Sequence, residues 1–94
     1  MIAEIESRLA LQLAPLALRV DDDSALHVGH VGAKSGGHYR VRIVATCFAG
    51  LPRVARHRLV YDAVSDLMQS AVHALAIEAL TPDEASPTSP AVAA

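Results

Sequence analysis

With 94 residues, the chain is long enough for one compact domain but not for two. Apolar residues make up 52% of the chain, which is enough for a globular fold and argues against disorder. The net charge of −2 argues against strong nonspecific binding to nucleic acid. A single cysteine, Cys47, excludes an intramolecular disulfide, and neither a signal peptide nor a membrane span can be recognised. We therefore expect a cytoplasmic protein with no membrane partner.

The first half of the chain is predicted to form a helix and two strands. Residues 2–14 place apolar side chains at helical spacing until Pro15 interrupts the pattern. Residues 16–21 and 38–47 alternate between apolar and polar, as strands with one buried face do. The second alternation predicts that Cys47 lies on the buried side.

The segment between these strands, residues 22–37, is predicted to be a loop. It contains four glycines and two histidines. Loops of this length are uncommon in small domains and usually functional.

The second half is predicted to form a helix and a further strand. Residues 53–70 show helical spacing, with Val54 and His57 on the packed side and Arg56 on the solvated side. Residues 72–80 are apolar almost throughout and by composition alone would also suit a continued helix. We interpret them as a strand, because they are short and are bounded by polar residues and by Pro82. A strand reached through a helical crossover would lie parallel to its neighbour.

The last residues are predicted to be a short cap followed by a tail. Thr81 and Glu84 have the spacing of a capping box, which starts one final helical turn. Residues 86–94 are rich in Ser, Pro and Ala and are predicted to be a disordered tail.

Histidines are the main candidates for metal ligands. His27 and His30 share the glycine-rich loop, where their side chains could turn toward one point, and imidazole is the commonest metal ligand in proteins. Solvated loop histidines are the alternative, because two histidines without nearby cysteines are a weak zinc pattern. For His73, at the start of the last strand, the residues alone favour a structural position at the edge of the core. His57 is likewise predicted to be structural.

The cysteine content limits the iron chemistry of this chain. A ferredoxin-type cluster takes about four thiolates, and Cys47 is the single thiol. Any cluster must therefore be ligated partly by histidine and partly by another molecule. We also find no carboxylate pair, phosphate-binding loop or nucleophile motif, so we predict no enzyme and no small-molecule substrate.

Five arginines form a candidate surface for nucleic acid. They lie on the second predicted strand and at the start of the second helix, where they could contact phosphate. Ordinary solvated arginines are at least as good an interpretation. The five are Arg40, Arg42, Arg53, Arg56 and Arg58.

Three separate motifs resemble the BolA family. The central strand and turn of that family are similar to Gly-His-Tyr-Arg-Val at 37–41 followed by Phe-Ala-Gly at 48–50. Its helix signature is similar to Arg-His-Arg-Leu-Val-Tyr at 56–61. Its last strand is similar to Val-His-Ala-Leu-Ala-Ile at 72–77, which is followed by Leu-Thr-Pro at 80–82. Order and spacing agree over residues 1–85, which are expected to form a BolA-like domain.

The resemblance implies a fold. This is a single α+β domain with the order helix-strand-strand-helix-strand and a three-stranded mixed sheet, similar to class II KH domains. It supports the interpretation of residues 72–80 as a strand.

The resemblance also implies a partner and a cargo. The partner is a monothiol glutaredoxin, and a [2Fe–2S] cluster is shared across the heterodimer in cluster assembly, trafficking or iron sensing. Glutathione and the glutaredoxin cysteine hold one side of the cluster. His73 and a loop histidine, best matched by His30 with His27 as the alternate, hold the other. No cluster is expected on the isolated protein.

A second function is also implied by the family. Its members are known as DNA-binding transcriptional regulators of cell morphology and stress response. The five arginines would then contact the DNA. Fold alone does not establish this function, and the acidic net charge argues against it.

Overall fold

The computed structural model describes residues 1–23, 37–69 and 72–85, with residue 73 described by its backbone. The predicted loop histidines and the predicted tail lie outside these residues. Eight elements follow one another along the chain: α1 (Ile2–Leu13), β1 (Ala17–Asp22), β2 (Gly37–Val44), the 3-10 turn η3 (Thr46–Phe48), α2 (Arg53–Ala63), α3 (Ser65–Met68), β3 (Val72–Leu80) and α4 (Pro82–Ala85).

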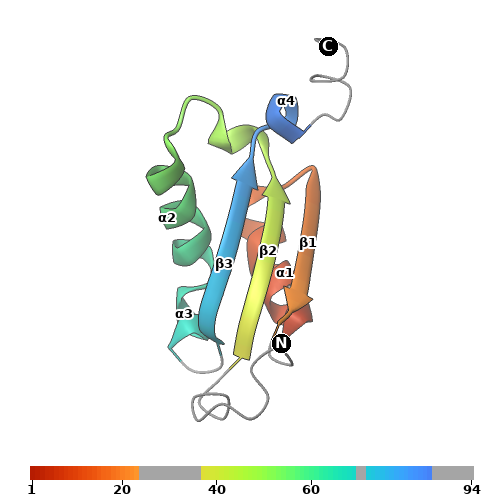
Figure 1. Cartoon of the computed structure of the whole chain (residues 1–94), viewed down its shortest axis with the longest axis vertical. Helices are drawn as coiled ribbons and strands as arrows, with labels where there is room; N and C mark the ends of the chain where they lie inside the picture. Colours follow the sequence, from red (N-terminus) through yellow and green to blue (C-terminus); the bar gives the residue numbers. More distant parts are fainter. Residues whose placement is uncertain (24–36, 70–71, 86–94) are drawn as a thin grey trace.

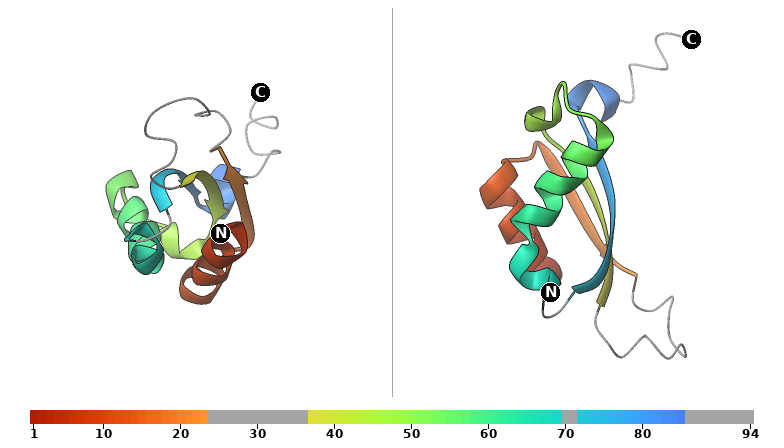
Figure 2. Two further views of the ribbon diagram at one scale, coloured as in Figure 1. Left: turned by 90° about the horizontal axis from the view of Figure 1, so that it is seen from below. Right: turned by 90° about the vertical axis from the view of Figure 1, so that its left-hand side faces the viewer.

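The three strands form one mixed sheet in the order β1-β2-β3 (Figure 1). β1 is antiparallel to β2, and β3 is parallel to β2, as the helical crossover between them predicts. The helices α1 and α2 cover the same face of the sheet and leave the other face open (Figure 2). The predicted α+β domain with its three-stranded mixed sheet is therefore confirmed. Among the described residues, no helix is both long and apolar enough to cross a membrane.

The core lies between the helices and the covered face of the sheet. α1 contributes Ile5 and Leu9, both fully buried, at the four-residue spacing that keeps them on one side of a helix. Burying a side chain of this size stabilises a fold by about 1.5–3 kcal/mol. The fully buried large side chains are Phe48, Ile5, Leu9, Ile43, Val41, Val60 and Val64.

The predicted helix over 53–70 is two helices. Val64 adopts φ −114° and ψ 19°, outside helical values, and separates α2 from α3. The prediction that Val54 packs inward is wrong, because its side chain is 69% exposed. Val54 precedes the buried Val60 by six residues, about one and two-thirds helical turns, so the two cannot share a face.

The predicted strand over 38–47 ends three residues early. β2 stops at Val44, and the chain then enters η3. The alternation of faces no longer applies there, so the 3-10 turn buries Phe48 and exposes Cys47. The prediction that Cys47 faces inward is therefore wrong. Its thiol lies 3.9 Å from the carbonyl oxygen of Leu13.

Candidate functional site

The end of the sheet at which β2 and β3 begin contains an irregularity at His73. Gly37 of β2 is paired with Val72 of β3, yet the next residue, His38, is paired with Ala74. His73 is therefore the extra residue of a β-bulge. Bulges interrupt strand pairing and redirect a side chain, and they are common beside functional sites.

The same end of the sheet also receives the segment that contains the other two predicted ligands. Asp23, which precedes residues 24–36, donates its backbone N–H to the carbonyl oxygen of His38 at 2.7 Å. Gly37, which follows that segment, is the first residue of β2. Both ends of the segment with His27 and His30 are thus fixed next to the bulge.

The convergence of His73 with one loop histidine, His30 or its alternate His27, stays a prediction. His27 and His30 lie outside the described residues, and His73 is described by its backbone. Within residues 1–23, 37–69 and 72–85, no group of three His, Cys, Asp or Glu side chains forms a metal site. The structure places a further histidine, His38, beside the bulge, where it is half-buried. The sequence interpretation treated it only as a strand residue. Its place in the Gly-His-Tyr motif was the available signal.

A glycine next to the bulge makes room for an aromatic ring. A Cβ atom at Gly37 would overlap the ring of Tyr39, two residues along the same strand. Tyr39 is buried, and this burial raises the pKa of its phenol, with the Asp22 carboxylate acting in the same direction. The Gly-His-Tyr motif thus has a packing reason: glycine is the residue that lets the Tyr39 ring fold back over the start of β2.

Cys47 lies far from this end of the sheet. It follows the last residue of β2, whereas the bulge adjoins the first. Eight residues of strand span about 23 Å at ~3.3 Å per step. Cys47 and a ligand at residue 73 cannot bind the same cluster within one chain.

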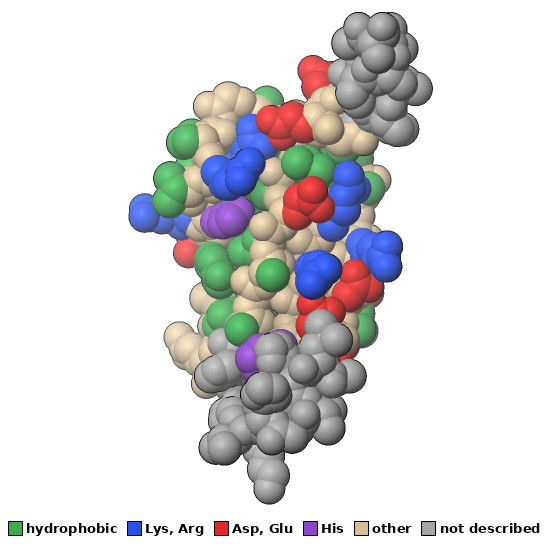
Figure 3. Space-filling view, viewed as in Figure 1, with side chains coloured by type: hydrophobic (Ala, Val, Ile, Leu, Met, Phe, Trp, Pro, Cys, Tyr) green, Lys and Arg blue, Asp and Glu red, His purple; other side chains and the backbone are tan. Residues whose placement is uncertain are grey.

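The candidate arginines do not form one basic surface. Arg40 and Arg42 lie on the open face of the sheet, where red and blue side chains alternate over the strands (Figure 3). Each is paired with an acid: Arg40 with Asp23 at 3.1 Å, and Arg42 with Glu78 at 3.2 Å. Surface pairs of this kind leave little positive potential for a polyanion.

Arg56 is a structural residue, and its predicted place on the solvated side is wrong. Its guanidinium donates to the carbonyl oxygens of Leu51 at 2.9 Å and Ala79 at 3.1 Å. It also forms two hydrogen bonds with the carboxylate of Glu84, which in turn accepts the backbone N–H of Thr81. The hydrogen bonds from Arg56 and Thr81 lower the pKa of Glu84 from 4.5 to about 2. The predicted capping box is confirmed by this contact and by the N–H of Glu84, which donates to the Thr81 hydroxyl.

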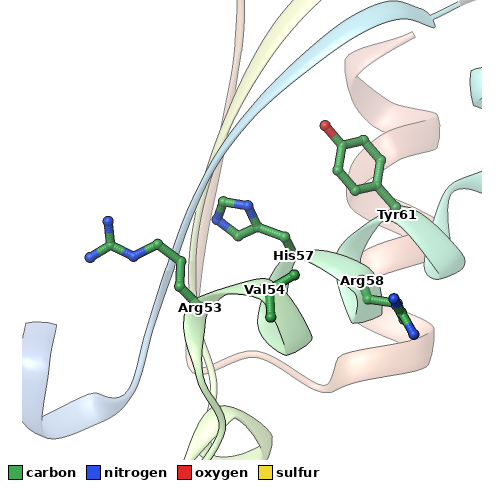
Figure 4. Close-up of a pocket in the computed structure, with 5 residues that line it drawn as sticks. All are labelled: Arg53, Val54, His57, Arg58 and Tyr61. Atoms are coloured by element: carbon green, nitrogen blue, oxygen red, sulfur yellow. The ribbon is translucent and has the colours of Figure 1, made fainter.

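Arg53 and Arg58 are arranged differently. Both are exposed and line a surface hollow on α2 together with Val54, His57 and Tyr61 (Figure 4). His57, predicted to be a packed residue, is half-buried there and turns toward β3. The arginine set thus divides into three members engaged with acids of this chain and two that line the same hollow.

Comparison with known proteins identifies the family. A family model described as BolA-like protein matches residues 9–84. The chain belongs to the BolA family. The solved structure of BolA1 from Arabidopsis thaliana has a TM-score of 0.80 at 34% identity and covers 92% of this chain and 96% of that one. The BolA domain of SufE1 from the same plant has a TM-score of 0.78 at 41% identity, with 88% and 93% covered.

Two curated BolA relatives differ in length and in name. SufE-like protein 1 of Arabidopsis thaliana is 40% identical over 85% of this chain, which spans 23% of that longer protein. A relative from Vibrio cholerae is 40% identical over 85% of this chain and 74% of its own length. That protein is named a DNA-binding transcriptional regulator. Neither of these two names denotes an enzyme class.

Proposed function

We propose that this BolA-family protein binds a [2Fe–2S] cluster carried by a monothiol glutaredoxin and shares it without catalysing a reaction. His73 supplies one ligand from this chain and His30 the other, with His27 as the alternate. Glutathione and the glutaredoxin cysteine supply the remaining ligands. The observation that supports this most is the bulge at His73, next to both ends of the segment that contains the loop histidines.

The bulge supports a ligand role for His73 over a purely structural one. In a regular strand residue 73 would have a partner in β2, whereas the register shift takes this residue out of the pairing. An interruption of regular pairing costs stability, so it calls for a compensating benefit elsewhere. A ligand directed out of the ladder toward incoming iron is such a benefit.

The position of Cys47 supports the need for a partner. One thiol at the opposite end of the sheet cannot join His73 on a cluster, so thiolates must come from another molecule. Two imidazoles in place of two thiolates make a cluster less negative and raise its reduction potential, as in Rieske centres. The proposed arrangement therefore suits a cluster that is transferred to another protein or used as a sensor. It suits a low-potential electron carrier less well.

The test is a titration of this protein with cluster-loaded monothiol glutaredoxin in the presence of glutathione. Visible absorption and circular dichroism follow the change in cluster ligands. The native protein is expected to change both spectra with saturation at equal amounts of the two proteins. His73→Ala abolishes the change and His30→Ala weakens it. If His27→Ala weakens the change instead, His27 is the loop ligand.

The matched control for this titration is His57→Ala. It removes an imidazole from α2, away from the bulge, and is expected to leave the spectra as in the native protein. A native response from His73→Ala would contradict the proposal.

DNA binding is the second candidate, because the Vibrio cholerae relative bears that function in its name. Against it, Arg40, Arg42 and Arg56 are engaged with acids of this chain. If DNA is the ligand, affinity falls steeply with salt and falls further when Arg53 and Arg58 are changed to Gln. Salt-independent binding, or none to a duplex, removes this candidate.

A further inference from the structure

The seven arginines of the chain fall into two groups, those paired with a carboxylate and those without such a pair. Five meet a carboxylate within 3.2 Å, and two, Arg53 and Arg58, have no ion pair among the described residues. The five pairs are Arg8–Asp66, Arg19–Asp21, Arg40–Asp23, Arg42–Glu78 and Arg56–Glu84. In a chain with a net charge of −2, two arginines of the described residues thus have no acidic partner, and both line the same hollow on α2.

The hollow also exposes apolar surface. Val54 is 69% exposed and Tyr61 40%, and these are two of the four large apolar side chains that the described part of the chain exposes. The Tyr61 hydroxyl donates to the carbonyl oxygen of Leu75 at 3.1 Å, so its polar end is already engaged. What Tyr61 offers a partner is therefore the apolar ring.

The shape indicates a ridge between two hollows. One hollow, of about 660 Å³, is lined by Val54 and Arg58 with Arg53, His57 and Tyr61. A second, of about 370 Å³, lies on the other side of the same two residues and is lined by Leu51, Ala55, Leu59 and Asp62. Figure 4 shows Val54 between the Arg53 and Arg58 side chains, which point away from each other. A ridge of this kind suits an extended partner that lies across it more than a small molecule held in one cavity.

We propose that this face of α2 binds an acidic amphipathic helix of a partner protein. Apolar side chains of that helix, at i, i+3 or i+4 and i+7, pack on both sides of Val54 and against the Tyr61 ring. Glu or Asp residues that flank the apolar stripe pair with Arg53 and Arg58. The proposal goes beyond cluster sharing, since it does not use His73 or the loop.

Charge and apolar exposure together favour a protein over nucleic acid. Two arginines neutralise few phosphates, and the remaining arginines of the described residues are held by acids of this chain. The exposed Val54 between the two cations would face a phosphate backbone without an apolar counterpart. An acidic helix matches both the cations and the apolar ridge.

The experiment uses a synthetic, fluorescein-labelled helical peptide with a leucine stripe flanked by glutamates. Fluorescence anisotropy measures affinity, and amide shifts in ¹H–¹⁵N spectra map the contact. We expect a dissociation constant on the order of 100 µM, with shifts confined to residues 51–62. The double variant Arg53→Gln/Arg58→Gln weakens binding about five- to tenfold, and Val54→Ser weakens it without loss of the fold, because Val54 is exposed.

Three controls make the result decisive. Arg40→Gln/Arg42→Gln removes the same charge from the open sheet face and is expected to bind the peptide as the native protein does. His73→Ala is also expected to bind it normally, so that failure of this proposal and failure of cluster sharing are distinguishable. A peptide with Lys in place of every Glu is expected not to bind.

The proposal is overturned by no saturable shift at 1 mM peptide, by equal losses in the two double variants, or by shifts mainly outside residues 51–62. It is also overturned if a short DNA duplex binds more tightly than the peptide and depends on Arg53 and Arg58. That outcome would assign the face to nucleic acid.

Discussion

The two ends of the sheet are built in opposite ways. Where β2 and β3 finish, Arg56 ties the start of α2 to Ala79 and Glu84, and Phe48 is buried beneath. Where the same strands begin, the pairing is interrupted at His73, and Gly37 leaves the space that the Tyr39 ring occupies. The contrast teaches that the Arg56 hydrogen bonds close the end where the strands finish, whereas the irregular pairing and the candidate ligands lie at the end where they begin.

The largest expected effect on stability is at the hydrogen-bonded end. Phe48→Ala removes a fully buried ring and is expected to lower the free energy of unfolding by about 3–5 kcal/mol. That is a large part of the 5–15 kcal/mol typical of a domain. Urea unfolding followed by circular dichroism measures the loss, and a change below about 1 kcal/mol would show that this end does not hold the fold.

A pair of glycine variants compares the two ends directly. Gly37→Ala forces the Tyr39 ring to move and is expected to cost about 1–3 kcal/mol and to weaken cluster sharing. Gly50→Ala introduces a side chain at φ +77° in open space, costs about 1–2 kcal/mol through backbone strain, and should leave cluster sharing unchanged. Equal effects of both variants on the cluster titration would contradict the separation of the ends.

A smaller loss of stability is expected from Arg56→Gln. The variant loses the two carbonyl contacts and the pair with Glu84. Arg42→Gln is the control, because it removes one surface pair, with Glu78, on the open face of the sheet. The urea midpoint should fall more for Arg56→Gln, and the reverse order would be evidence against a structural role for Arg56.

The smallest effect is the pH dependence of the same contact. The pKa of Glu84 is about 2 in the folded protein against 4.5 ordinarily, so its carboxylate stabilises the fold above pH ~4.5. That contribution is lost as the pH falls from ~4.5 toward 2, where the folded protein also takes up the proton. The native urea midpoint is therefore expected to fall over this window, and Glu84→Gln should flatten the fall. A parallel decline in both proteins would assign the acid sensitivity to other groups, among them Asp66, whose pKa is lowered by Arg8.

Sequence patterns predicted the elements well because apolar periodicity reports which face is buried. Residues 72–80 were the difficult case, and the polar residues around them indicated a strand correctly. The errors lie where regular geometry ends: Cys47 lies beyond the end of β2, and the predicted helix is interrupted at Val64. Alternation and helical spacing do not indicate where such interruptions occur.

The candidate site was less predictable than the fold. The residues alone favoured a structural His73, and its ligand role was implied only by the resemblance to the BolA family. The bulge could not be predicted, because it depends on the register between two strands far apart in sequence. The role of Arg56 was missed for a similar reason, since its carbonyl partners come from a turn and from β3. A list of basic residues cannot separate it from Arg53 and Arg58.

The most direct test of the central claim is a measurement of nitrogen at the cluster. This protein is labelled with [¹⁵N]histidine, combined with unlabelled glutaredoxin, glutathione and a [2Fe–2S] cluster, and reduced for pulsed electron paramagnetic resonance. We predict ¹⁵N couplings from imidazole bound to iron, which disappear in His73→Ala. A native complex with no ¹⁵N coupling, or one unchanged by His73→Ala, would contradict the proposal that the bulge residue of β3 binds the cluster.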